Sequence, residues 1–211
     1  MGGWQTSYRR NVAPRLLNCC LGMRTPTQLR RTVCAGLAGD VVEIGFGSGL
    51  NVPHYPKTVA SVAAVEPADV AWQLASRRVA ASGVPIRHAG IDGQKLSFDD
   101  DTFDMALSTW TLCSIPDAPT ALAELRRVLR PGGRYLFLEH GLAPDVRVQR
   151  MQHRVRATHH AVFGGCDLIK PVLALIEGAG FELDGVRSFY QRRAPKYVGA
   201  DSLGAAVNPG T

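Results

Sequence analysis

Short apolar runs alternate with segments of helical spacing through the middle of this chain. The apolar runs are rich in valine and alanine, which is typical of strands covered on both faces. Glycine and proline clusters separate them from amphipathic segments whose apolar positions recur every three or four residues. Strands are predicted at 40–44, 59–65, 86–89, 102–112 and 134–139, and helices at 69–81 and from 116–119 to a stop at 131–133.

This alternating order is typical of an α/β protein. Strands joined by helices form a parallel sheet with right-handed crossovers, covered by helices on both faces. We therefore expect a doubly wound, Rossmann-like, mostly parallel seven-stranded sheet, with an antiparallel strand supplied by the C-terminal part of the chain.

The flanking segments fit around this sheet without a linker or an internal repeat. The N-terminal part predicts two helices broken near Thr25-Pro26, because proline is tolerated at a helix start but not inside a helix. We expect a single domain at 1–211, composed of a helical cap at 1–38, a core at 40–140, two further helices within 145–180 and C-terminal strands at 181–207.

Composition points to a cellular compartment. The chain has 211 residues, 45% of them hydrophobic, which is enough for a full core. No segment approaches the roughly 18 continuous apolar residues of a membrane span, and no apolar run follows the first charges, so no secretory signal is expected. Five cysteines without a C-x-x-C pair are typical of reduced thiols in a cytosol, so we expect a cytoplasmic protein.

Positive charge is concentrated at the N-terminal end. The formal net charge is +6, and residues 1–39 hold six arginines and no acidic side chain. Such a face attracts anionic lipid, so peripheral membrane contact through these helices is one interpretation. Solvated arginines on amphipathic helices are the other, and the pattern favours it. Aromatic residues are sparse there, and no nucleic-acid partner is expected.

A glycine-rich turn follows the first strand. The strand ends in Glu43-Ile44, and glycines then occupy every second position, at Gly45, Gly47 and Gly49. Glycine lets the backbone turn sharply and approach a ligand closely. The dinucleotide fingerprint places its third glycine three residues after the second, where this chain has Leu50. The spacing therefore disfavours a nucleotide-linked dehydrogenase.

Polar side chains follow the other strands, at the edge where open α/β sheets bind ligands. Glu66 follows the second strand, and a carboxylate there can accept hydrogen bonds from the ribose hydroxyls of an adenosine ligand. Asp92 follows the third strand, where it can accept from an exocyclic amino group. Glu139 and His140 follow the fifth. The sequence therefore predicts one ligand site along this edge.

In this order, the motifs resemble the class I S-adenosylmethionine-dependent methyltransferases over about residues 40–140. The resemblance is carried by the glycine turn, Glu66-Pro67, Asp92 before Leu96-Ser97-Phe98, the acidic turn at 99–104 and the run 125–133. It implies S-adenosyl-L-methionine as the cofactor, with the turn against its methionine part, Glu66 on the ribose and Asp92 at the adenine. The predicted cofactor-binding residues are Glu43, Gly45, Gly47, Gly49, Glu66, Asp92, Gly93 and Thr109.

A narrower likeness extends beyond this core. The runs 111–114 and 138–140 and the stretch from His160 to Cys166 look like the thiol S-methyltransferases of the methyltransferase-like group and their bacterial relatives. The chain departs from the mammalian pattern by lacking a hydrophobic N-terminal anchor and by having Phe46 where many relatives have cysteine. The likeness implies a small-molecule methyl acceptor bound near the helices at 145–180.

Two histidines are the catalytic candidates. Methyl transfer requires the acceptor to be held in line with the activated methyl group, and requires a base where the acceptor has a high pKa. His140 is predicted to be that base or a substrate contact, or alternatively an imidazole that fixes the strand end through a loop carbonyl. His160 is predicted to face inward from a helix at 145–163 that covers the substrate pocket.

No metal is expected. Three histidines lie on that same helix near Cys166, and histidine and cysteine are zinc ligands, but four arginines on the helix would repel a cation. Cys113 and Cys166 are expected to line the pocket or the core, because methyl transfer needs no covalent enzyme intermediate.

The first functional hypothesis is a methyltransferase acting on a thiol or on a phenolic or quinol oxygen of a small molecule. The residues 109–112 lack the Asn/Asp-Pro-Pro-Tyr/Phe run that marks amino-group methylation of nucleic-acid bases or proteins. The alternatives are a phospholipid N-methyltransferase docked on a membrane and a non-catalytic module that binds the cofactor. The sequence indicates neither the acceptor nor the oligomeric state.

Overall fold

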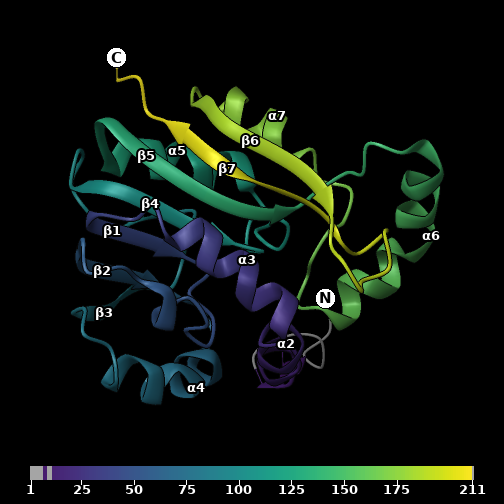
Figure 1. Cartoon of the computed structure of the whole chain (residues 1–211), viewed down its shortest axis with the longest axis horizontal. Coiled ribbons are helices and arrows are strands. Elements are labelled where there is room, and N and C mark those ends of the chain that lie inside the picture. The colour runs from purple at the N-terminus through teal and green to yellow at the C-terminus, as the bar shows by residue number, and fades with distance from the viewer. Residues whose placement is uncertain (1–6, 9–10, 211) are drawn as a thin grey trace.

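The computed structural model describes residues 7–8 and 11–210, and they are organised around one seven-stranded sheet (Figure 1). The sheet order is β3-β2-β1-β4-β5-β7-β6. The strands are β1 Gly39–Ile44, β2 Val59–Val65, β3 Ile86–Gly90, β4 Phe103–Thr109, β5 Leu129–His140, β6 Glu182–Tyr190 and β7 Ala200–Val207. Every pairing is parallel except those of β7, which runs antiparallel to β5 and to β6. The predicted fold class is confirmed.

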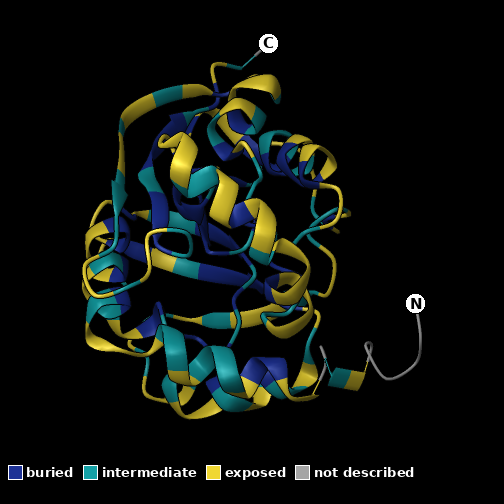
Figure 2. Cartoon of the chain, turned by 90° about the vertical axis from the view of Figure 1, so that its right-hand side faces the viewer, coloured by how far each residue is buried: buried dark blue, intermediate teal, exposed yellow. Residues whose placement is uncertain are grey.

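Helices cover both faces of this sheet (Figure 1). They are α2 Ala13–Leu21, α3 Arg24–Cys34, the short 3-10 helix η1 Val52–His54, α4 Asp69–Ala80, α5 Ala118–Val128, α6 Val146–Val162 and α7 Val172–Gly178. On one face Val33 and Leu37 pack against Leu107 and Leu138, whereas on the other Leu122 packs with Ile176 and the opposite sides of the strands. Buried residues gather on the strands between helices whose outer sides are exposed (Figure 2).

The strand order places the glycine turn at the centre of the sheet edge. The chain builds outward from β1 to β2 and β3, and then returns to the other side of β1 with β4 and β5. Ligands of such sheets bind beyond the carboxyl ends of the strands at this reversal. The turn at 45–49 follows β1 directly, so the topology presents it at this edge.

Several element boundaries differ from the predicted ones, each for a local reason. The N-terminal helices separate at Gly22-Met23, and Pro26 instead lies in the first turn of α3. Strand β4 ends at Thr109 because Trp110 has a left-handed φ of 52°. Strand β5 begins ten residues before Glu139, at Leu129, and accommodates the predicted stop at 131–133 as a register shift. Helix α7 starts only at Val172, after Pro171.

The C-terminal end of β7 is fastened to this irregular start of β5 by Asn208. Its backbone pairs with Gly132 and Gly133, and its buried Nδ2 donates to the carbonyl oxygens of Leu129 at 2.8 Å and Arg126 at 3.1 Å. The side chain thus satisfies carbonyl groups that the helix end and the irregular strand leave open.

Replacement of Asn208 by alanine is expected to leave those buried carbonyls unpaired. The loss should lower the free energy of unfolding by about 2 kcal/mol, which lowers the Tm of a chain of this size by about 4–8 °C. Thermal unfolding followed by circular dichroism measures the shift, with exposed Lys57→Ala as the control. An unchanged Tm in Asn208→Ala would contradict this role.

Candidate active site

The glycine turn is closed on its inner side and open on its outer side. Gly45 has a φ of 68°, and a Cβ there would lie 2.1 Å from Oγ1 of Thr111, so only glycine fits. Gly47 has a φ of 59°, but a Cβ there would meet no atom closer than 3.8 Å. The backbone at Gly47 can therefore be approached closely from outside.

Glu66 lies against this turn, as its place after β2 predicts. Its carboxylate accepts from the backbone N–H of Gly47 at 2.7 Å and of Ala68 at 2.8 Å. Burial raises the pKa of Glu66, and the two backbone donors oppose that rise. A carboxylate has about four acceptor positions, so two hydrogen bonds leave capacity for a ligand.

The segment after β3 is more exposed than the turn. Oδ1 of Asp92 accepts from the backbone N–H of Gln94 at 2.9 Å, which fixes a local bend. Gly93 lies beside Ile44, at the end of β1. Ile91, which the sequence reading did not single out, leaves 67% of its surface exposed beside Asp92. This edge therefore offers a carboxylate next to an apolar surface.

Glu43 and Thr109 lie beneath the turn, in a buried polar network that sequence reasoning missed. Glu43 accepts from Nδ2 of Asn51 at 2.9 Å and from the hydroxyl of Tyr55. Oγ1 of Thr109 accepts from Nη1 of Arg30 at 2.6 Å and from Nδ2 of Asn51 at 3.0 Å. Burial raises the pKa of the Glu43 carboxyl to about 7. The network anchors the base of the turn, and its members come from α3, from β1, from the residues that flank η1 and from β4.

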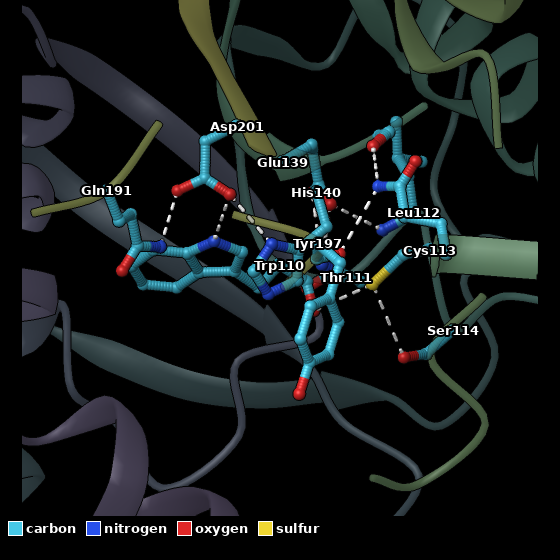
Figure 3. A network of polar contacts seen from close by, with 12 residues as sticks. Trp110, Thr111, Leu112, Cys113, Ser114, Glu139, His140, Gln191, Tyr197 and Asp201 are labelled. Carbon is cyan, nitrogen blue, oxygen red and sulfur yellow. Dashed lines mark hydrogen bonds and ion pairs between the residues drawn. The ribbon is translucent and has the colours of Figure 1, made fainter. Parts of the chain in front are cut away.

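Glu139 holds the loop that follows β4. Its carboxylate accepts from the backbone N–H groups of Thr111 at 2.9 Å and Leu112 at 3.0 Å (Figure 3). It also accepts from the hydroxyl of Ser108 at 2.5 Å. Burial raises the pKa of Glu139 to about 7 despite these donors. This loop carries Trp110, whose left-handed φ marks a strained position of the kind that clusters at functional sites.

His140 is paired with Asp201, from the start of β7. Its Nδ1 lies 2.7 Å from Oδ1 of Asp201, which also accepts from Nε1 of Trp110 at 3.3 Å (Figure 3). Oδ2 accepts from Nε2 of Gln191 at 2.5 Å. Burial disfavours the imidazolium, but the Asp201 carboxylate outweighs it and raises the pKa of His140 to about 9. The His140 side chain remains 9% exposed.

This pairing corrects one of the two interpretations of His140. Its Nδ1 partner is a carboxylate and not a loop carbonyl, so the alternative in which a carbonyl fixes the strand end is wrong. Asp201 lies 61 positions later in the chain and reaches His140 only because β7 inserts beside β5. No local pattern in the sequence signals that contact.

His160 does not face inward from α6. It lies on the exposed side of the helix, whereas His159 is buried, with Nδ1 3.3 Å from the carbonyl oxygen of Cys166 and its ring stacked on Phe163. The buried side of α6 is formed by Gln152 and His159, seven positions apart, which equals two helical turns. Met151 and Val162, two apolar side chains of the same helix, are exposed.

Cys113 and Cys166 are buried together with Leu168, in agreement with their predicted place in the pocket wall or core. Within residues 7–8 and 11–210, no three His, Cys, Asp or Glu side chains gather as metal ligands would. Over the same residues, no helix is long and apolar enough to cross a membrane.

The basic N-terminal part has a mixed structure. Arg15, Arg24 and Arg31 are exposed, as the solvated interpretation requires. Arg30 is an exception, because it is buried and its guanidinium lies 4.9 Å from the ring centroid of Trp110. Two of the six arginines, Arg9 and Arg10, lie outside the described residues.

Comparisons with known proteins find methyltransferases that are similar to this chain. Residues 42–137 match the family described as methyltransferase domain. Phosphatidylethanolamine N-methyltransferase of Cereibacter sphaeroides is 30% identical over 104 residues, which are 48% of this chain and 51% of that protein. Human thiol S-methyltransferase TMT1A is 28% identical over 157 residues, which are 70% of this chain and 62% of that protein. The chain thus spans between half and two thirds of these two curated relatives.

Solved structures extend the likeness in fold to nearly the whole chain. A SAM-dependent methyltransferase from Thermotoga maritima has a TM-score of 0.69 at 21% identity, covering 95% of this chain and 98% of that one. Residues 42–137 therefore form a methyltransferase domain, and the glycine turn, Glu66 and the sheet order agree with the fold of the class I S-adenosylmethionine-dependent methyltransferases.

Proposed function

We propose that this protein transfers the methyl group of S-adenosylmethionine to a thiol, or to a phenolic or quinol oxygen, of a small molecule. The observation that carries the proposal is the His140–Asp201 pair, which lies at the same sheet edge as the glycine turn. Human thiol S-methyltransferase TMT1A, similar over 70% of this chain, supports a thiol as the first acceptor to test.

The residues around the glycine turn suit this cofactor. The open side of Gly47 admits the methionine part, the spare acceptor positions of Glu66 suit the ribose hydroxyls, and the exposed side chain of Ile91 beside Asp92 suits an adenine ring. When bound, S-adenosylmethionine supplies a methyl carbon activated by its sulfonium. Glu43 and Thr109 act from below, by anchoring the turn on which the cofactor would rest.

His140 is suited to removing the acceptor's proton. Asp201 holds Nδ1, and Nε2 has no hydrogen-bond partner among the described residues. In the neutral imidazole, Nε2 accepts the proton from the S–H or O–H group, and the resulting imidazolium is stabilised by Asp201. In the protonated form that its pKa of about 9 favours at neutral pH, the same ring stabilises a thiolate or phenolate by charge.

A labelled-methyl assay tests this proposal. The purified chain is incubated with S-adenosylmethionine carrying a radioactive methyl group and, in separate reactions, with thiophenol, a phenol, a quinol or phosphatidylethanolamine vesicles. We expect label in the thiol or in the phenolic or quinol product. Transfer to the aminophospholipid alone would contradict the proposal, and no transfer to any acceptor would favour a non-catalytic module.

A phospholipid N-methyltransferase is the second candidate, and the outer side of α6 is the observation that favours it. Val146 and Met151 are 57% and 41% exposed, beside exposed Arg147 and Arg150. Apolar side chains next to arginines are typical of helices that lie on anionic membranes. Co-sedimentation with anionic vesicles that falls as salt rises would support this candidate, and binding that ignores lipid charge would count against it.

A further inference from the structure

A second feature of the same sheet edge has no place in the proposed chemistry so far. A cavity of about 530 Å³ lies between α3 and the end of β6 with the residues that follow it. Its wall includes the four arginines Arg24, Arg187, Arg192 and Arg193, together with Leu29 and Phe189. We call these four residues the arginine cluster.

The positive charge of the arginine cluster is unbalanced. No acidic residue is among the described residues that line the cavity. Among residues 7–8 and 11–210, no carboxylate lies within ion-pair distance of any of the four guanidinium groups. Like charges gathered without counter-charges repel one another, so an anion in this cavity would relieve the repulsion.

Three local features prepare this cavity for a polar ligand. The Arg187 guanidinium is 5.1 Å from the ring centroid of Phe189, which fixes its position. Tyr190 lines the cavity, and its hydroxyl is buried with no hydrogen-bond partner within the described part of the chain. Arg193 has a left-handed φ of 68°, a conformation that non-glycine residues seldom adopt.

The N-terminal end of α3 reinforces the field of the cluster. Arg24 and Thr25 begin this helix of 11 residues and line the cavity, and no side chain caps the helix there. Uncapped N–H groups at a helix start carry partial positive charge. The guanidinium groups and the helix end therefore act on the same space.

The cavity also adjoins the proposed base. Gln191 lines it, and its Nε2 donates to Oδ2 of Asp201 at 2.5 Å, while Oδ1 of the same carboxylate holds His140 (Figure 3). Two side chains, those of Gln191 and Asp201, thus separate the cavity from His140.

We propose that the arginine cluster binds an anionic group of the methyl acceptor, a carboxylate, sulfonate or phosphate, with an aromatic or aliphatic portion of the acceptor against Leu29 and Phe189. Guanidinium groups bind such anions through paired hydrogen bonds. The inference rests on the proposed function and names its substrate class: an aryl or alkyl thiol or phenol that carries a negative charge away from the reacting atom.

Matched acceptors test this assignment. The variant Arg187→Gln/Arg192→Gln is assayed with 3-mercaptobenzoate and with the uncharged 3-methylbenzenethiol, and exposed Arg77→Gln on α4 is the control. We expect the ratio of kcat/KM for the charged over the uncharged thiol to fall roughly tenfold to a hundredfold in the double variant, as expected for lost charge-assisted hydrogen bonds. An unchanged ratio, or an equal fall in Arg77→Gln, would overturn the proposal.

A binding measurement separates this inference from the proposed function. Calorimetry with 3-(methylthio)benzoate, which cannot be methylated at a free thiol, reports anion binding whether or not the protein turns over. We expect measurable binding by the natural chain and its loss in the double variant, including where no methyl transfer is found. Binding of phosphatidylglycerol vesicles is measured with the same two proteins. No binding of the soluble carboxylate would contradict a soluble anionic acceptor, and so would a double variant that loses vesicle binding but still binds the carboxylate.

Discussion

Replacement of His140 by glutamine is expected to lower kcat for methyl transfer to a thiol or phenol by roughly 10²–10⁴-fold, the usual contribution of a positioned base. Glutamine keeps a hydrogen-bond donor toward Asp201 but cannot accept a proton. Because the change leaves the glycine turn and Glu66 intact, cofactor affinity should stay within about twofold of the natural value. Single-turnover kinetics measure the first quantity, and calorimetry measures the second.

The pH dependence provides the sharper test of that role. With a phenol, whose own pKa is about 10, His140 must act as a base in its deprotonated form, so the rate with the natural chain should rise with pH and level off above about 9, the pKa of His140. In Asp201→Asn the carboxylate that raises this pKa is lost, so the inflection should move to lower pH. An inflection that stays in place, or a His140→Gln variant with natural kcat, would contradict the assignment.

The His140–Asp201 pair should also stabilise the fold, and this stabilisation should decrease as the pH rises, whereas the rate should increase. The pKa of His140 in the folded chain, about 9, lies above its ordinary value of 6.5. A group of this kind stabilises the fold fully below about pH 6.5, and its contribution disappears as the pH rises through about 9. The difference in Tm between the natural chain and Asp201→Asn should therefore be larger at pH 6 than at pH 9.5.

Glu66→Gln is expected to weaken binding of S-adenosylmethionine by roughly tenfold to a hundredfold. Hydrogen bonds to a charged group contribute about 1.5–3 kcal/mol each, and the amide loses one of the two acceptor oxygens that face Gly47 and Ala68. The change would therefore weaken both the ribose contact and the local hold on the turn. Calorimetric titration with S-adenosylhomocysteine measures the effect without turnover.

Two further variants serve as a control and as a test of the adenine contact. Asp99→Asn changes an exposed carboxylate in the turn before β4 and should leave affinity unchanged. Asp92→Ala should weaken binding if this carboxylate contacts the adenine, as its place after β3 predicts. If Glu66→Gln bound S-adenosylhomocysteine with the natural affinity, the placement of the ribose at Glu66 would be contradicted. If Asp92→Ala did so, the placement of the adenine at Asp92 would be contradicted.

The parts of the site that the sequence predicted are those encoded by strand ends. Gly45 and Glu66 each follow a strand directly, and parallel strands bring their carboxyl ends to one edge. The structure places Glu66 beside the turn, where its carboxylate accepts from the backbone N–H of Gly47. For the same reason the fold class could be predicted from the alternation of apolar runs and helical spacing.

The parts that the sequence did not predict depend on distant contacts. Asp201 reaches His140 across 61 positions, and Arg30 reaches Thr109 across 79. Neither side chain belongs to a local sequence pattern. Arg30 is buried, whereas Arg24 and Arg31 on the same helix are exposed. The prediction that His160 faces inward from α6 was wrong. The helix has few apolar side chains to indicate its buried side, and His159, one residue earlier, is the buried histidine.

The insertion of β7 between β5 and β6 has a consequence for how the protein is made. A ribosome completes the glycine turn, Glu66 and the strands around them long before it reaches Asp201. The nascent chain can therefore assemble a place for the methyl donor while His140 still lacks its carboxylate partner. The carboxylate that raises the pKa of His140 arrives only with the last strand, so a chain halted before residue 200 would have the glycine turn and Glu66 but not the His140–Asp201 pair.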